Sequence, residues 1–191
     1  MKWTFALVLL SFVILSSLNA APTRIVAGCG RVISNYDEQK KETRVQLRPL
    51  ILEGVFQTAP GESLMSENSL PNDDHGVAFT AIYSYPGKAP ARPQTIVIVV
   101  ESESASPKYE NDRQLRLSLD GSVLDLGTSQ REVSRTNMAL VREDLSAVVS
   151  PAQFVKIAKA KKLKLSVGPN SFTLTECQME ALKKLAAGIP T

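Results

Sequence analysis

The segment 115–126 constrains the fold of this chain most, because its hydrophobic pattern and its turn residues favour the same structure. Leucines alternate with polar residues up to Asp120-Gly121, and apolar residues return directly after it. An Asp-Gly pair favours the two-residue turn whose twist matches that of antiparallel strands. Such a turn places three pairs opposite one another: Leu119 with Ser122, Leu117 with Leu124, and Leu115 with Leu126. Paired residues share one face of a sheet, so the segment predicts a β-hairpin with one buried side.

Alternating or continuous apolar runs predict strands over much of the remaining chain. They lie at 43–47, 50–56, 77–85, 95–100, 133–149, 163–167 and 172–174. The run TIVIVV at 95–100 is rich in β-branched residues, which predicts a central strand covered on both faces. The last two runs are expected to form a hairpin in which Val167 faces Phe172 and Leu165 faces Leu174.

Two short helices are predicted from the residues that precede them. Ser150 stands before Pro151, and Gln153 occupies the third helical position, which is the pattern of a capping box. Thr175 and Gln178 repeat this pattern ahead of the second helix. The strands and helices together predict a mostly β fold, either a β-sandwich or a strongly bent antiparallel sheet, with two short C-terminal α-helices.

Residues 1–20 are predicted to form a cleavable signal peptide. Lys2 supplies a positive start, an apolar run follows, and small residues surround Ala20. The run is too short to cross a bilayer, which needs about 20 apolar residues, and we expect no transmembrane span in the mature chain. We therefore expect an exported protein, periplasmic or extracellular. It would hold a single β-rich domain at 21–191 with a long loop near 57–76, where Gly, Pro, Ser, Asn and Asp are frequent.

The two cysteines, Cys29 and Cys177, allow three states. Two thiols in an oxidising compartment tend to form a disulfide, and Cys177 lies on the side of its predicted helix opposite the apolar stripe. The residues Val26 to Cys29 also match a bacterial lipobox, in which acylation of the cysteine anchors the protein to a membrane. We expect the disulfide, with a lipid anchor on Cys29 or a free reactive thiol as the alternatives.

Three further groups of side chains are candidates for binding or chemistry. Lysines between the first helix and the next strand are a candidate patch for anionic partners, although such a cluster is more often a solvated charged face: Lys156, Lys159, Lys161, Lys162 and Lys164. Asp73, Asp74 and His75 could offer a metal two or three ligands, but a complete site needs more, so we expect a solvated loop and no bound metal. Glu101 and Glu103 could serve as an acid/base pair, although glutamates that leave a strand end are more often solvated.

The charge balance limits the classes of partner. The chain has 22 basic and 19 acidic residues, and loss of Lys2 with the leader leaves 21 against 19, a net charge of +2. This balance does not predict nucleic-acid binding, and no aromatic residues interleave the lysines for base stacking. With a single histidine and no Gly-x-Ser-x-Gly turn, serine hydrolysis is not expected.

Several segments resemble a group of uncharacterised exported bacterial proteins. The resemblance begins at Tyr36-Asp37 and Thr43–Val45 and continues through three longer segments: Leu115 to Gly127, Pro151 to Gly168, and Phe172 to Leu185. It covers most of the mature chain and consists of a layout of strands and helices without a catalytic signature. The resemblance implies an extracytoplasmic location and implies nothing about activity.

These observations predict a non-enzymatic exported binding or structural module, envelope-associated or extracellular. Its expected partner is a protein or an envelope component, and no cofactor is expected. Two alternatives stay open. One is a hydrolase that acts on cell-envelope polymers through Glu101 and Glu103, and the other is a lipoprotein anchored through Cys29.

Overall fold

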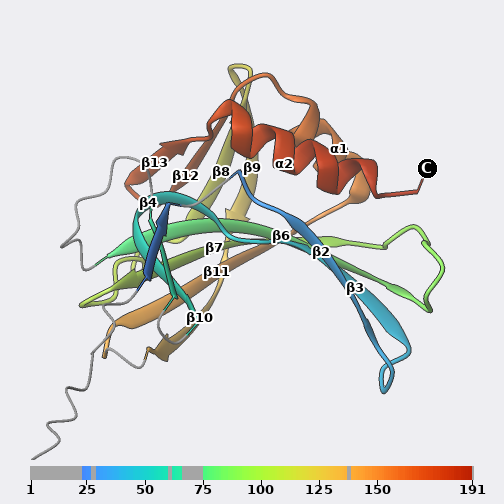
Figure 1. Ribbon diagram of the computed structural model, residues 1–191. Coiled ribbons are helices and arrows are strands. Elements are labelled where there is room, and N and C mark those ends of the chain that lie inside the picture. Colours follow the sequence, from blue (N-terminus) through green and yellow to red (C-terminus); the bar gives the residue numbers. More distant parts are fainter. Residues whose placement is uncertain (1–22, 27–28, 60–61, 66–74, 137–138, 191) are drawn as a thin grey trace, which may run out of the picture.

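The computed structural model describes residues 23–26, 29–59, 62–65, 75–136 and 139–190, and most of them lie in β-strands (Figure 1). In chain order the strands are β1 (Thr23–Val26), β2 (Val32–Asp37), β3 (Glu42–Leu47), β4 (Leu50–Ala59), β5 (Glu62–Met65), β6 (Gly76–Pro86), β7 (Ile96–Ser104), β8 (Gln114–Leu119), β9 (Ser122–Thr128), β10 (Gln130–Arg135), β11 (Val141–Val149), β12 (Leu163–Val167) and β13 (Asn170–Thr173). The helices are α1 (Pro151–Lys159) and α2 (Glu176–Ala187). The predicted signal peptide lies outside the described residues.

The strands form two sheets. In the larger sheet the order is β1-β5-β4-β6-β7-β11-β10, with β3 also paired to β6 and β2 paired to β3. The smaller sheet has the order β13-β12-β8-β9. Neighbouring strands are antiparallel except β1 and β5, which are parallel. The mostly β fold expected from the sequence is confirmed.

Both helices and the smaller sheet lie on one side of the larger sheet (Figure 1). One apolar core joins side chains from both sheets and both helices. We call the side of the larger sheet that faces this core the core face, and the opposite side the outer face. Neither of the two described helices lies over the outer face, and the β2–β3 hairpin at one end of the sheet slopes toward that face (Figure 1).

Capping boxes start both helices, as the sequence predicts. The Ser150 hydroxyl accepts a hydrogen bond from the Gln153 N–H at 3.2 Å, and the Gln153 side chain accepts one from the Ser150 N–H at 2.9 Å. Thr175 and Gln178 form the same pair of bonds at 3.3 and 2.9 Å. The Gln178 amide also donates to the carbonyl oxygen of Ile51 at 2.9 Å, so the start of α2 is tied to β4.

A disulfide joins Cys29, just before β2, to Cys177 in the first turn of α2, with the two Cα atoms 4.9 Å apart. Next to it, Gly30 adopts a φ of 76° and lies against Leu50 and Ala181. A Cβ atom on Gly30 would stand 2.3 Å from a Leu50 methyl carbon, so only glycine lets the chain pass this closely beneath α2. The disulfide prediction is confirmed.

The β8–β9 hairpin turns at Asp120-Gly121, where both residues have positive φ values of 51° and 91°. The expected pairs of Leu119 with Ser122 and of Leu117 with Leu124 are present. The third pair is wrong, because a register shift beyond these pairs places Leu115 opposite Gly127. The expected β12–β13 register is wrong by two residues: Leu165 faces Phe172, and Val167 faces Asn170.

Strand β4 bends along its antiparallel pairing with β6. A register shift interrupts their pairing, and just beyond it Gly54 lies opposite Gly76. A Cβ atom on Gly54 would stand 2.0 Å from one backbone oxygen, and a Cβ on Gly76 would stand 2.2 Å from another. This close approach therefore requires glycine on both strands. Beyond the bend, Phe56 packs with Ile51 and Ala78 in a small apolar cluster separate from the main core.

The segment 57–76, for which the sequence predicts a long loop, begins as sheet. Strand β4 continues to Ala59, and β5 covers Glu62–Met65. Residues 60–61 and 66–74 lie outside the described residues.

Candidate functional site

Alternation along β7 separates the two faces of the larger sheet. Ile96, Ile98 and Val100 lie on the core face with no exposed surface. Val97 and Val99 point to the outer face and are only half-buried. β7 pairs with β6 on one side and β11 on the other, so the prediction of a central strand is confirmed. The prediction that both of its faces are covered is wrong.

A groove crosses the outer face. It consists of two adjoining hollows of about 640 and 380 Å³, which share Arg44, Ile82 and Val97 in their linings. Ile82 and Val97, with Val99 in the second hollow, form an apolar floor of strand side chains. We call the part next to the β2–β3 hairpin the hairpin end, and the part next to β10 and β11 the acidic end.

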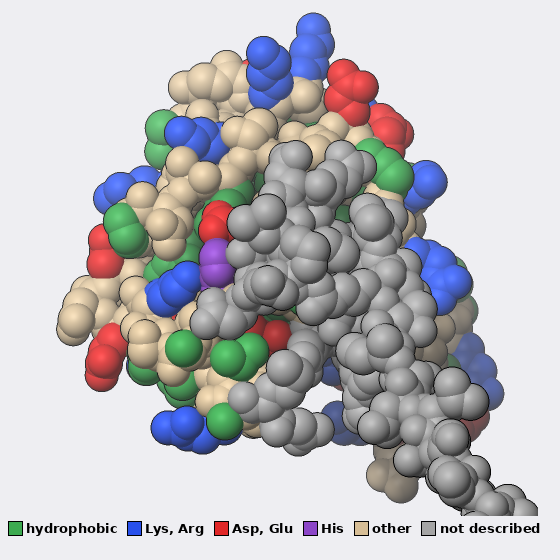
Figure 2. Space-filling view, turned by 60° about the vertical axis from the view of Figure 1, so that its left-hand side comes forward, with side chains coloured by type: hydrophobic (Ala, Val, Ile, Leu, Met, Phe, Trp, Pro, Cys, Tyr) green, Lys and Arg blue, Asp and Glu red, His purple; other side chains and the backbone are tan. Residues whose placement is uncertain are grey.

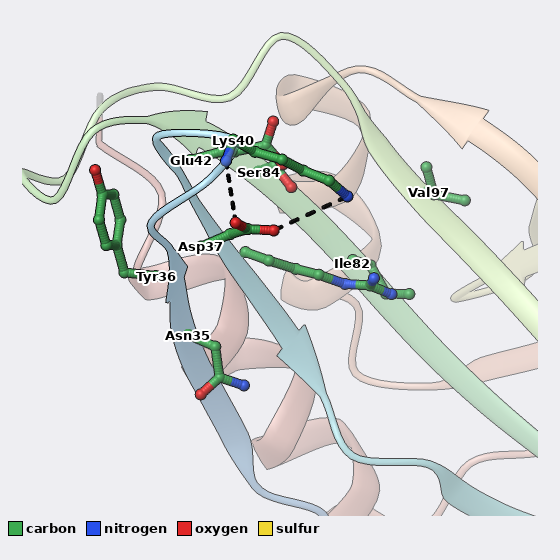
Figure 3. Close-up of a pocket in the computed structure, with 9 residues that line it drawn as sticks. Asn35, Tyr36, Asp37, Lys40, Glu42, Ile82, Ser84 and Val97 are labelled. Carbon is green, nitrogen blue, oxygen red and sulfur yellow. Dashed lines mark hydrogen bonds and ion pairs between the residues drawn. The ribbon is translucent and has the colours of Figure 1, made fainter.

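Polar groups from the hairpin surround the hairpin end (Figure 3). The Asp37 carboxylate accepts the N–H groups of Gln39 at 2.9 Å and Lys40 at 3.0 Å. The hydrogen bond from Lys40 is the main cause that holds the pKa of Asp37 below its usual value. Figure 3 shows Ile82 and Val97 on strands that lie across the hollow from Asn35 and Tyr36.

The acidic end is built around one guanidinium group. Arg142 contacts the carboxylate of Glu101, lies 3.5 Å from Glu103 Oε1 and lies 3.2 Å from Asp144 Oδ1. Its guanidinium carbon also lies 5.0 Å from the centre of the Phe56 ring, a cation–π contact. The strand register explains the cluster, because Glu101 pairs with Asp144 and Glu103 pairs with Arg142 across β7 and β11.

Both glutamates of this cluster are buried. Glu101 exposes 7% of its surface and Glu103 exposes 1%, so the prediction that they are solvated at a strand end is wrong. The reason is that β7 continues to Ser104 with β6 and β11 on either side. Burial is the main cause that raises the pKa of Glu101 to about 7; the charges of Asp144 and Glu103 act in the same direction, and Arg142 opposes them.

A third buried carboxylate, Glu143, lies on the core face and serves a different purpose. Its oxygens accept the backbone N–H of Lys108 at 2.6 Å, the N–H of Tyr109 at 3.2 Å and the Arg131 Nε at 2.8 Å. Tyr109 is fully buried, and its hydroxyl accepts a hydrogen bond from the Asn170 amide at 3.0 Å. Glu143 therefore ties the β7–β8 connection to β11 of the larger sheet, while the Tyr109 hydroxyl ties the same connection to β13 of the smaller sheet.

The candidate lysines are all exposed. Lys156 and Lys159 on α1 line a separate hollow of about 480 Å³, and Asp120 of the β8–β9 turn lies in the same lining. The Asp120 carboxylate accepts the N–H groups of Lys161 at 3.0 Å and Lys162 at 2.8 Å, so it fastens the turn to the segment after α1. Lys164 lies exposed on β12. The negative charge of Asp120 therefore lies within the candidate lysine patch.

The predicted loop site is only partly described. Asp73 and Asp74 lie outside the described residues, and the ring Nε2 of His75 lies 2.8 Å from Glu53 Oε1. Within the described part of the chain, no three His, Cys, Asp or Glu side chains are placed to hold a metal ion.

Local sequence patterns did not point to most of the groove. Arg142 and Asp144 carried a usable signal, because the alternation in Val141–Val149 places both on the face opposite Leu145. Arg44 and Glu132 come from strands far apart in the sequence, and nothing in the chain order brings them together. Pairing of distant strands creates this site.

Comparison with protein-family models, with curated proteins and with solved structures finds no match for this chain. Among the helices of the described residues, none is long and apolar enough to cross a membrane.

Proposed function

We propose that this chain is an exported, non-enzymatic binding module whose ligand binds in the outer-face groove. The observation that carries this proposal is the continuity of the two hollows across the sheet through Arg44, Ile82 and Val97. Ligand sites are concave, with an apolar lining and a few placed polar groups. The groove has this composition, with an apolar floor between two charged ends.

Export is supported by the Cys29–Cys177 disulfide, since such bonds persist in oxidising compartments and are rare in the cytosol. The leader predicted at 1–20 supports the same location. An exported binding module of this kind would meet a protein or another component of the cell envelope.

A pair of matched substitutions tests the groove as the binding surface. Val97→Lys places a charge on the apolar floor, whereas Val123→Lys makes the same change on β9, where Val123 is 68% exposed. Purified wild-type protein and both variants are immobilised and exposed to envelope extracts. We expect a component that the wild type and Val123→Lys retain and Val97→Lys loses. Equal retention by all three proteins, or no retained component, contradicts the proposal.

Hydrolysis of envelope polymers through Glu101 and Glu103 is the second candidate. It is favoured by one observation, the carboxyl group of Glu101 with a pKa of about 7 in the lining of a groove. Against it, Glu103 is 1% exposed and both carboxylates are engaged by Arg142. Release of product from a panel of envelope polymers, lost in the double variant Glu101→Gln with Glu103→Gln, would favour hydrolysis over binding.

The lipoprotein alternative concerns a single sulfur atom. Cys29 pairs with Cys177 in the structure, and a thioether to a lipid would need the same atom. The intact mass of the secreted protein distinguishes the two states. A gain of two hydrogens on reduction supports the disulfide, whereas a diacylglycerol-sized addition on an N-terminal cysteine supports the anchor.

A further inference from the structure

The acidic end of the groove carries more negative than positive charge. Its carboxylates come from three neighbouring strands and are Glu101, Glu103, Glu132 and Asp144. Among the described residues, the cations that line this hollow are Arg142, which already contacts three of the carboxylates, and Arg44. The lining therefore has an excess of acid, and the repulsion of Glu101 by Asp144 and Glu103 is a direct consequence of it.

The carboxylates differ in their access to solvent. Glu132 is exposed on β10, and the Asp144 side chain is 37% exposed on β11, so both can meet an incoming cation. Glu101 lies deeper and Glu103 deepest. A cation that enters the hollow would first replace water around Asp144 and Glu132. The negative charge of the more deeply buried Glu101 and Glu103 would attract it further.

The floor beside these carboxylates is apolar. Val99 lies between Thr80 on β6 and Ser146 on β11, and Ile82 and Val97 extend the floor toward the hairpin end. A lysine or arginine side chain suits this arrangement, because its aliphatic stem can lie on apolar surface while its charged head reaches a carboxylate. Side chains of an extended peptide that point to the same side repeat every two residues, at roughly 7 Å. Such a peptide can place an apolar side chain next to a basic one along the floor.

We propose that the acidic end of the groove binds a basic side chain of an extended peptide segment from a partner protein, with a neighbouring apolar side chain of that segment on the Ile82–Val97–Val99 floor. This inference rests on the proposed function and names its ligand class. Charge complementarity between the carboxylates of the acidic end and a basic side chain of the peptide supports this inference. Opposite potentials across an interface select the partner and fix its register.

Binding of a cation is coupled to the proton on Glu101. In the part of the chain that the structure describes, the charged groups that face Glu101 are Glu103 on its own strand, Arg142 and Asp144 on β11, and Glu132 on β10. Strands β6 and β4 contribute the uncharged Ala78 and Phe56. A bound ammonium or guanidinium favours the ionised form of Glu101. The affinity for a basic peptide should therefore be higher at pH 8 than at pH 5.5.

Fluorescence anisotropy with labelled pentapeptides tests this inference. The probe alternates valine and lysine, and the comparison peptides carry acetyl-lysine or glutamate at the lysine positions. We expect binding of the lysine peptide that weakens with added salt, and at least about tenfold weaker binding of the other two, the effect of losing one partly desolvated ion pair. Equal binding of the lysine and acetyl-lysine peptides overturns the inference.

Two double variants locate the binding site. Asp144→Asn with Glu132→Gln removes two negative charges from the acidic end, and Asp112→Asn with Glu110→Gln removes two exposed charges from the segment before β8. We expect about tenfold loss of lysine-peptide affinity in the first and no change in the second. Equal affinity of both variants overturns the inference. If the peptides do not bind but the retained envelope component still depends on Val97, the ligand class is wrong and the proposed function stands.

Discussion

The two faces of the larger sheet are buried by different kinds of residue. On the core face of β7, Ile96, Ile98 and Val100 are fully buried by apolar neighbours. On the outer face of the same strand, the valines stay half-exposed, and the deeply buried positions belong to Glu101 and Glu103.

This difference separates stabilising burial from burial that costs free energy. Removing apolar surface from water stabilises a fold, whereas burying a carboxylate is unfavourable unless its partners compensate fully. On the core face Glu143 has such partners in two backbone N–H groups and Arg131. On the outer face Glu101 shares one guanidinium with Glu103 and Asp144, and its raised pKa shows that compensation is incomplete. Carboxylates with strongly shifted pKa values cluster at functional sites. This observation favours the outer face over the core face as the functional surface.

The largest effect should come from the cross-link that holds α2 over the core face. The disulfide spans a sequence separation of 148 residues. In the chain-entropy model, removing a cross-link that closes a loop of this length lowers the free energy of unfolding by about 4–5 kcal/mol. The double variant Cys29→Ala with Cys177→Ala, compared with the oxidised wild type by urea denaturation, measures it. A loss well below about 1 kcal/mol would mean that packing alone holds α2 in place.

Next in size is the loss of the compensated carboxylate on the core face. Glu143→Ala leaves Arg131 and two backbone N–H groups without their acceptor in a buried site, which should cost about 3–5 kcal/mol. Glu180→Ala on the exposed face of α2 serves as the control for helix-surface charge removal. Urea denaturation of both variants decides whether Glu143 stabilises the fold by holding the β7–β8 connection on β11. Near-equal stability of the two would contradict it.

A pair of adjacent residues on β7 compares the two faces directly. Ile98→Ala opens a cavity in the core and should cost about 2–5 kcal/mol. Val99→Ala removes a half-buried side chain from the groove floor and should cost less than about 1.5 kcal/mol. Thermal and urea unfolding give both values, and similar losses at 98 and 99 would show that the outer face is as well packed as the core.

The pH dependence of stability tests the uncompensated carboxylate. The folded protein holds a proton on Glu101 up to a pKa of about 7, against 4.5 for the free group, so this residue favours the folded state below pH 4.5 and loses that contribution as the pH rises to 7. The loss is on the order of 3 kcal/mol. Glu101→Gln should flatten the decline between these pH values in urea denaturation series, whereas Glu38→Gln on the exposed hairpin should leave it. A decline unchanged in Glu101→Gln would show that another group causes it.

Sequence patterns predicted the local structures that neighbouring residues determine. The turn at Asp120-Gly121 and the capping boxes at Ser150 and Thr175 depend on residues within four positions, and all three are present. The Leu115–Leu126 pair failed because a register shift in the β8–β9 ladder carries no hydrophobic signature. The groove could not be predicted, since its floor and walls need β3, β6, β7, β10 and β11 side by side.

The buried glutamates show the same limit in another form. A charged residue after an apolar run reads as the end of a strand, and Glu101 follows TIVIVV in this way. Its burial depends on Asp144 and Arg142, which lie more than 40 residues further along the chain. The antiparallel pairing of β7 with β11 continues past the apolar run, so Glu101 lies within the paired part of the strand and not at its end.

The Cys29–Cys177 bond also has a consequence for the integrity of the polypeptide. It closes most of the described chain into one covalent ring, with α1 and every described strand except β1 inside it. A protease that cuts one peptide bond between these cysteines therefore produces two fragments that stay joined through sulfur. Such a nick is visible only on a reducing gel, and the clipped protein can keep both pieces of its sheet until the disulfide is reduced.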